Sequence, residues 1–275
     1  MATRMKKGDI LAASAGAILA LVFLLPMVYT VVSSVKPLPE ILRVPFQWIP
    51  RTVQLSNFTE PLIYGRFGRY FLNSIIVAIA VTAAELFFSS LAGFSLAKYR
   101  YRGRTIFFTA ILAVMIVPIE TIIVPLGIIV RAFGLMNSYS GLIIPVAITP
   151  FGVFWMRQFF LTLPNDYIEA ARVDGMREFQ IFRSIAWPMA GPAVFALLIF
   201  AFMGNWNSFI WPLVVARADA FRTIPVGLVS FQEEFGTSWH YLFAMSVLAI
   251  IPTAFIFIAF RKRLLHGLAM IGIKG

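Results

Sequence analysis

The chain has 275 residues, of which 60% are hydrophobic and only 13% are charged. Soluble domains are about half apolar and about a quarter charged, so this composition excludes an ordinary soluble domain and indicates a membrane protein. The net charge of +11 does not indicate a nucleic-acid partner, because the basic residues stand in short stretches between long apolar runs. Cysteine is absent, which excludes a disulfide framework, a thiolate zinc site and a cysteine nucleophile.

Six apolar segments are each long enough to cross a hydrocarbon core of roughly 30 Å, which takes about 20 helical residues. Helices are favoured over strands because backbone polar groups in lipid must bond within their own segment. The first segment is longer than the cleaved part of a signal peptide, so we expect it to be retained. The sequence thus predicts an all-α, polytopic membrane bundle of about six transmembrane helices, at residues 10–32, 71–96, 105–130, 141–161, 189–215 and 241–260.

The basic residues between these spans predict the orientation of the chain. One side carries about twice as many Lys and Arg as the other, and that side is expected to face the cytoplasm. It holds both termini, the tight turn 99–104 and a long loop at 163–188, whereas loops 33–70 and 217–239 would be external. We therefore expect a multi-pass protein of the cytoplasmic (inner) membrane of a bacterium or archaeon.

The loop between the fourth and fifth spans reads EAARVDGMREFQIFRSIAWPMAGP over residues 169–192, and its spacing predicts a helix–turn–helix outside the bilayer. Asn165 or Asp166 can cap the first helix, on which Glu169 can pair with Arg172 at i,i+3. The pair Asp174-Gly175 predicts the end of this helix, because glycine accepts the left-handed conformation of a helix terminus.

A second short helix would carry Phe179, Phe182 and Ile185 on one stripe and end before Pro188. From the residues alone, two interpretations of the helix pair remain open. It can be a rigid element that transmits force from a soluble partner to the spans, or an amphipathic loop on the membrane surface.

This stretch resembles the EAA loop of permease subunits in bacterial binding-protein-dependent ABC importers. Pro192 also falls at the motif's spacing, and Met176 stands where the family often has a small residue. The resemblance implies that the loop is a coupling helix, which seats in a cleft of an ATPase subunit. The implied ATPase-coupling residues are Glu169, Ala170, Ala171, Asp174, Gly175, Phe182, Ile185 and Pro188.

The remainder of the chain is similar to the maltose-type carbohydrate permeases within that family. The similarity lies in short pieces that occur in the family's order and spacing. These pieces are FLNS at 71–74, AGFSLAKYRYRGR at 92–104, MIVPIETIIVPL at 115–126, GLMNSYSGLIIP at 134–145, WNSFIWPLV at 206–214 and GLAMIGIKG at 267–275.

The resemblance implies a type I ABC importer permease that imports sugars or oligosaccharides by alternating access. It also implies a heterodimer with a second permease subunit, two ATPase subunits that hold ATP and Mg, and an external substrate-binding protein that meets loop 217–239. The chain would divide into 1–70, with the first span and external loop, and 71–275, the permease core with its coupling loop and tail. The alternatives are a permease for a phosphorylated polyol or another small polar solute, or, in another class, an ion-coupled secondary transporter.

The energy source is expected to lie on other subunits. The chain contains no G-x-x-x-x-G-K-[ST] phosphate loop and no Gly-Lys pair at all. His240 and His266 lie far apart in sequence and are expected to be interfacial or tail residues. We therefore expect a pore subunit that is not itself an enzyme and has no catalytic, cofactor or metal site.

Polar residues inside the spans are candidates for the solute pathway. Glu85 and Glu120 stand near span centres, where a charge costs about 2.5–3.5 kcal/mol, so each should face a wet cavity or a buried partner. Asn205, Trp206 and Asn207 in the fifth span combine amides and an aromatic ring, which suits sugars, although interhelical bonding explains them equally well. Prolines that can kink the spans stand at 118, 125, 145, 150, 212 and 252.

Overall fold

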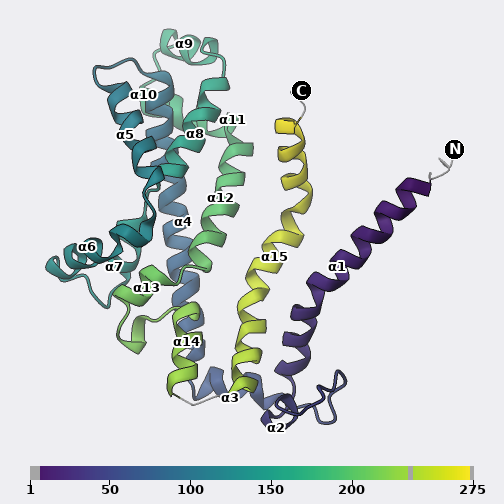
Figure 1. Ribbon diagram of the computed structural model, residues 1–275. Helices are drawn as coiled ribbons and strands as arrows, with labels where there is room; N and C mark the ends of the chain where they lie inside the picture. Colours follow the sequence, from purple (N-terminus) through teal and green to yellow (C-terminus); the bar gives the residue numbers. More distant parts are fainter. Residues whose placement is uncertain (1–6, 235–237, 273–275) are drawn as a thin grey trace. The chain divides into compact units, whose positions relative to one another are not determined.

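The computed structural model describes residues 7–234 and 238–272, and within these ranges every regular element is a helix (Figure 1). The predicted all-α class is therefore confirmed. The chain forms two compact units, which are described separately. Unit 1 comprises Met1–Gly68 and Leu228–Ile251, and unit 2 comprises Arg69–Gly227 and Pro252–Gly275.

Unit 1 begins with α1 (Lys7–Ser34), whose apolar side chains are largely exposed, as in a helix that faces lipid or another subunit. Two short helices, α2 (Leu38–Ile41) and α3 (Ser56–Ile63), order the segment that the sequence indicated only as a loop. The buried amide of Asn57 holds this segment against the end of α1 by donating to the carbonyls of Ser34 and Lys36, at 3.0 and 2.8 Å.

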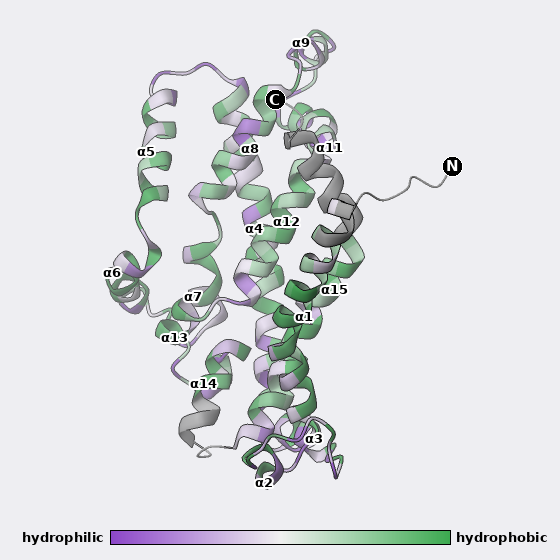
Figure 2. Ribbon diagram, turned by 45° about the vertical axis from the view of Figure 1, so that its right-hand side comes forward, coloured by the Kyte–Doolittle hydropathy of each residue, from purple (hydrophilic) through white to green (hydrophobic). Residues whose placement is uncertain are grey.

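Unit 2 contains the elements around which the candidate site is built. Its helices are α4 (Phe67–Lys98), α5 (Arg104–Ile116), α6 (Ile119–Ala132), α7 (Tyr139–Ile143), η1 (Ile144–Val146), α8 (Pro150–Thr162), α9 (Asp166–Val173), α10 (Glu178–Ile181), a π-helical turn η2 (Phe182–Ala186), α11 (Trp187–Met189), α12 (Gly191–Trp206), α13 (Ile210–Val215) and η3 (Asp219–Phe221). Three helices have residues in both units: α4, whose first two residues belong to unit 1, α14 (Ile224–Glu234) and α15 (Trp239–Gly272). Apolar residues cover α4 and α12 along most of their length (Figure 2).

Three helices of the described chain are long and apolar enough to cross a membrane without a break: 12–34 of α1, α4, and 239–260 of α15. Three bent helix pairs bring the number of spans to six if each pair is one crossing. The span expected at 105–130 is not one helix, because α5 and α6 meet at 106° across a break at Pro118. The 13 residues of α5 reach only about 20 Å. Residues 141–161 likewise contain a bend of 44°, and 189–215 are interrupted between α12 and α13.

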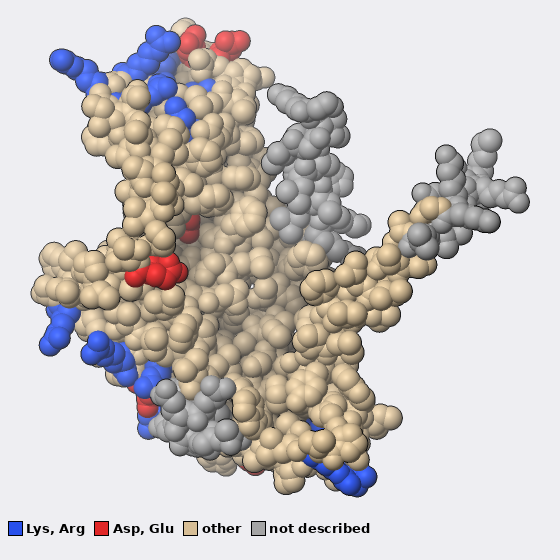
Figure 3. Space-filling view, in the orientation of Figure 1, with Lys and Arg blue, Asp and Glu red and all other residues tan. Residues whose placement is uncertain are grey.

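On the face shown in Figure 3, Lys and Arg gather at the two ends of unit 2, and the surface between them is uncharged except for a few acidic groups. This distribution suits a body whose middle lies in lipid and whose ends lie in water. The chain-end bases Arg4, Lys6 and Lys274, on which the predicted orientation partly depends, lie outside the described residues, as does the side chain of His266.

A close approach of α4 and α8 supports the end of unit 2 that carries α9. A Cβ placed on Gly93 of α4 would lie 2.7 Å from the backbone nitrogen of Arg157 and 2.8 Å from Cβ of Met156 on α8. Small residues allow such contact between membrane helices. A buried apolar cluster that includes Phe94, Phe160 and Phe182 continues from this contact to the underside of α9.

Candidate functional site

The loop expected at 163–188 is a helix–turn–helix, and α9 ends as the sequence indicated. Gly175 has φ of +81°, the left-handed conformation that favours glycine, and it follows directly on Asp174. The expectation that the second helix stops before Pro188 is wrong: α10 continues through the π turn η2 into α11. Pro188 comes directly after this π turn, where the regular i→i−4 hydrogen bonding of the helix is already interrupted.

Two local contacts differ from those expected on α9. The side chain of Asn165 does not cap the helix, because its Oδ1 accepts a hydrogen bond from Nζ of Lys98 at 2.8 Å. Arg172 does not pair with Glu169 but with Glu178, at 2.8 Å, because the turn at Gly175 brings α10 back toward α9.

The eight coupling candidates divide into an outward and an inward set. Ala171 and Phe182 are buried in the apolar cluster beneath the loop, and Ile185 is half-buried against it. The exposed members are Glu169, Ala170, Asp174, Gly175 and Pro188. Large apolar side chains accompany them: Val173 is 88% exposed, Tyr167 56% and Phe179 53%. Exposed apolar groups beside charges on a polar loop are typical of a surface that contacts another protein.

Lys98 at the end of α4 and Tyr99 directly after it hold this loop at two places, before α9 and at the start of α10. We call these contacts the α4 tether. Nζ of Lys98 donates to the carbonyl of Leu163 at 2.6 Å as well as to Asn165, just before α9. The hydroxyl of Tyr99 donates to Oε2 of Glu178 at 2.6 Å, at the start of α10. The bidentate pairing of Arg172 with the same carboxylate completes a three-residue contact.

The electrostatics of the α4 tether follow from these bonds. The hydrogen bond from Arg172, and then that from Tyr99, lower the pKa of Glu178 below its usual value. Burial, and then the hydrogen bond to the Glu178 carboxylate, raise the pKa of Tyr99, so the phenol stays protonated and remains a donor. The contact therefore requires an ionised Glu178.

Replacing Glu178 with glutamine is expected to lower the thermal stability of the purified protein at neutral pH but not in acid. Because the pKa of Glu178 is depressed on folding, its stabilisation is fully present above the ordinary glutamate pKa of 4.5 and is lost as the pH falls through the lowered value. Thermal unfolding of both proteins as a function of pH measures this difference. A difference that stays constant from neutral to acidic pH would contradict the ionised tether.

A cavity of about 420 Å³ lies within unit 2, where the predicted spans are interrupted. Its walls come from α4, α6, η1, α8, α12 and α13. It adjoins three breaks: those before α6, before α8, and between α12 and α13. Non-helical backbone at membrane depth is tolerated only where protein buries it or where it lines a wet cavity. The cavity is therefore the candidate solute pathway.

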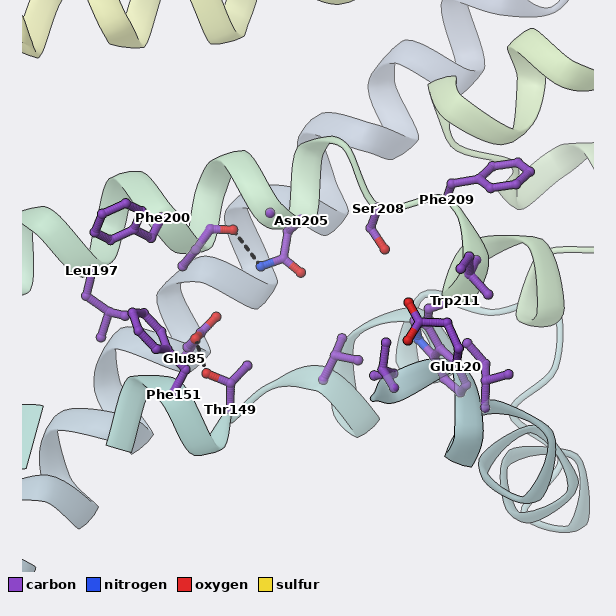
Figure 4. Close-up of a pocket in the computed structure, with 16 residues that line it drawn as sticks. Glu85, Glu120, Thr149, Phe151, Leu197, Phe200, Asn205, Ser208, Phe209 and Trp211 are labelled. Atoms are coloured by element: carbon purple, nitrogen blue, oxygen red, sulfur yellow. Dashed lines mark hydrogen bonds between the residues drawn. The ribbon is translucent and has the colours of Figure 1, made fainter. Parts of the chain in front are cut away.

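Three of the five pathway candidates line this cavity, and two do not. Glu85 and Glu120 lie at its two ends, with Asn205 between them on the facing helix (Figure 4). Trp206 is buried elsewhere, edge-on to Phe71, and Asn207 bonds back to the carbonyl of Met203 at 2.8 Å. Neither lines the cavity.

The cavity is also lined by Thr149, Phe151 and Phe200, which the sequence patterns did not indicate as pathway residues. A signal for Thr149 was present, since threonine followed by proline is a common start of a helix. Thr149 caps α8 by accepting from the backbone N–H of Gly152 at 3.0 Å, and its hydroxyl donates to Oε1 of Glu85. Glu85 thus orients the residue that starts α8.

A Glu85→Leu variant is expected to lose about 1–3 kcal/mol of stability, because the half-buried Thr149 hydroxyl loses its acceptor at the start of α8. Glu85→Gln keeps an acceptor oxygen of nearly the same shape and should lose much less. Thermal unfolding of the two variants in detergent checks this. Equal losses would show that the charge of Glu85, rather than its hydrogen bond to Thr149, carries the stabilisation.

A helical body whose spans break beside a largely apolar cavity with a few polar side chains, and whose exposed helical loop is held on one end, is typical of a membrane transport subunit. A family model described as "Binding-protein-dependent transport system inner membrane component" matches residues 85–269. The chain belongs to this family, which makes it a multi-pass permease component of an ABC transport system and confirms the resemblance of its EAA loop.

Individual relatives match over nearly the whole chain. The arabinooligosaccharides transport system permease protein AraQ of Bacillus subtilis is 37% identical, over 94% of this chain and 92% of that protein. The sn-glycerol-3-phosphate transport system permease protein UgpE of Rhizobium meliloti is 31% identical, over 90% of this chain and 91% of that protein.

A solved structure has the same fold. It is the crystal structure of a bacterial ABC transporter involved in the import of the acidic polysaccharide alginate, one chain of which aligns with a TM-score of 0.84. The alignment covers 95% of this chain and 99% of that one at 24% sequence identity.

Proposed function

We propose that this chain is a pore-forming subunit that imports sugars or oligosaccharides by alternating access, driven by ATP hydrolysis on separate subunits. The observation that carries the proposal is the cavity at the interrupted spans. Carboxylates, an amide and hydroxyls accompany the aromatic rings of Phe151, Phe200, Phe209 and Trp211 there. Polar groups bond sugar hydroxyls and rings stack on the apolar faces of pyranoses, so this set suits a saccharide. The AraQ relatives, whose names specify arabinooligosaccharides, support the same class.

The proposed complex contains this chain, a second permease subunit, two ATPase subunits that hold ATP and Mg, and an external substrate-binding protein. Both termini and the α9 loop would face the cytoplasm. The exposed apolar side chains of α9 and α10 support docking of an ATPase subunit at the five exposed coupling positions, and Ala171, Phe182 and Ile185 would support the loop from beneath. The external segment around η3 would meet the binding protein.

In the proposed cycle, closure of the ATPase subunits on nucleotide displaces the α9 loops of both permeases. The α4 tether passes this displacement to α4, whose Glu85 lines the cavity. The cavity then opens outward to receive the solute, and hydrolysis returns it to the inward-open state. The breaks before α6 and α8 are the places where the helices can change their angle.

Affinity purification of the tagged chain, expressed with its neighbouring transport genes, tests this function. An ATPase and a second permease should co-purify, and the complex in liposomes should import a neutral oligosaccharide only with ATP and the loaded binding protein. Uptake of a phosphorylated polyol in place of the oligosaccharide would favour the alternative solute that the UgpE relatives suggest. Uptake driven by an ion gradient without any ATPase would falsify the proposal.

A further inference from the structure

The ionisable groups on the wall of the cavity have one sign. Within the described residues, its lining contains the carboxyl groups of Glu85 and Glu120 and no Lys, Arg or His. The basic residues of unit 2 lie at its two ends instead, whereas acidic residues are visible in its middle (Figure 3). A solute in the cavity therefore meets acidic groups without a basic residue on the wall.

Glu120 lies at the N-terminal end of a helix. It lies in the first turn of α6, where the free backbone N–H groups and the helix dipole stabilise a negative charge. The basic residue of the same helix, Arg131, stands in the last turn. It is about 16 Å along the axis, beyond the Debye length of about 8 Å at physiological salt. Its charge is therefore a weak counterion for Glu120.

The other polar groups of the cavity present oxygens to the solute. Asn205 uses its Nδ2 in a 2.8 Å hydrogen bond to the carbonyl of Ala201, and its Oδ1 turns away from that bond (Figure 4). Ser208 lies beside it, between Glu85 and Glu120 (Figure 4). Oδ1 of Asn205 accepts hydrogen bonds from sugar hydroxyls, and the Ser208 hydroxyl can both accept and donate. An ionised phosphate or carboxylate has no proton to donate to Oδ1 of Asn205.

We infer that this cavity selects uncharged, hydroxyl-rich solutes and rejects anionic ones, with Glu120 as a specificity-determining residue. The inference rests on the proposed import function and narrows its substrate class. The inferred solute of this chain therefore differs in charge from that of relatives whose names specify an anion, such as sn-glycerol-3-phosphate. A phosphate group in this cavity would face two carboxyl groups without a basic side chain on the wall.

The test is direct binding to the complete importer in nanodiscs, without the binding protein, so that the cavity alone discriminates. The probes are a neutral trisaccharide and a trisaccharide of the same length that ends in a uronic acid, at low ionic strength. We expect the neutral probe to bind at least about tenfold more tightly. Glu120→Gln should reduce this ratio to within about threefold, and Glu120→Lys should invert it.

Glu60→Gln is the matched control, because it removes one negative charge from a residue that does not line the cavity, and glutamine keeps an oxygen that can accept from the Tyr241 hydroxyl. The ratio should stay at the wild-type value in this variant. Equal binding of the two probes, or a ratio that Glu120→Gln leaves unchanged, overturns the inference. If the importer nevertheless takes up oligosaccharides with ATP, the proposed function stands and only the inferred selectivity of the cavity is wrong. If neither probe binds and loaded binding protein does not stimulate ATP hydrolysis, both fail together.

Discussion

An Ala170→Trp variant is expected to lose ATP-driven uptake, with binding of the ATPase weakened by about a hundredfold or more. Ala170 is exposed on α9, next to exposed Glu169 and Val173, so an indole at this position would project from the proposed docking surface. A misfitted aromatic group in a packed interface costs about 3 kcal/mol, which corresponds to roughly a hundredfold in affinity. Co-purification of the ATPase and uptake by reconstituted complexes measure the two effects.

The control is Ala132→Trp, which adds the same side chain to an equally exposed alanine at the end of α6. This variant should retain the ATPase. Both variants should elute as folded protein in size-exclusion chromatography, because neither alanine is buried. Normal ATPase binding by Ala170→Trp would show that the exposed side of α9 is not the docking surface.

Gly93→Leu is expected to leave almost no folded protein. Even the first side-chain atom at this position would lie 2.7 Å from the backbone of Arg157, so α4 and α8 would have to separate. Separation opens the cluster around Phe94 and Phe160, and losses of this kind cost about 3 kcal/mol or more. That is a large fraction of the stability of an ordinary domain.

The yield of monodisperse protein and its unfolding temperature measure this effect. Gly191→Ala is the control, because no neighbouring heavy atom lies within 4 Å of an added Cβ. Alanine at this position should be neutral, or should stabilise α12 by up to about 0.5–1 kcal/mol. If Gly93→Leu folds as well as Gly191→Ala, the close approach of α4 and α8 is not what holds this end of unit 2 together.

The spans and the loop could be predicted because local patterns determine them. Runs of apolar residues indicate where the membrane helices lie. The pair Asp174-Gly175 indicates where α9 ends, because glycine adopts the left-handed conformation of a helix terminus without strain. Family membership followed from the same loop, since its motif combines these local features in a fixed order.

The breaks in the spans could not be placed in the same way, because proline has two different effects here. Pro118 caps α6 at a sharp bend, and Pro150 starts α8. Pro125 and Pro252, by contrast, lie inside continuous helices. The sequence shows the same residue in an apolar run in all these cases. Whether the helix breaks depends on what supports the freed backbone groups, which is a property of the tertiary structure.

Contacts between side chains on different elements could not be predicted from the sequence either. The partner of Arg172 was expected on its own helix at Glu169, but the turn at Gly175 brings Glu178 within reach instead. Glu85 and Thr149 are 64 residues apart, and no periodicity joins them. The cavity lies among such pairs, which explains why its acidic residues could be named but their grouping could not.

The uninterrupted course of α4 has a mechanical consequence. Its 32 residues extend for about 48 Å, with the tethered α9 loop at one end. At the other end, the amide of Asn73 donates to the carbonyls of Ala220 and Arg222, at 3.0 and 2.8 Å, and Ser74 accepts from the backbone N–H of Ile224. A continuous helix resists compression along its axis, so a displacement of the α9 loop should reach the segment around η3 nearly undiminished. In the proposed importer, α4 would then transmit conformational changes of the ATPase subunits to the segment around η3, where the substrate-binding protein is proposed to dock.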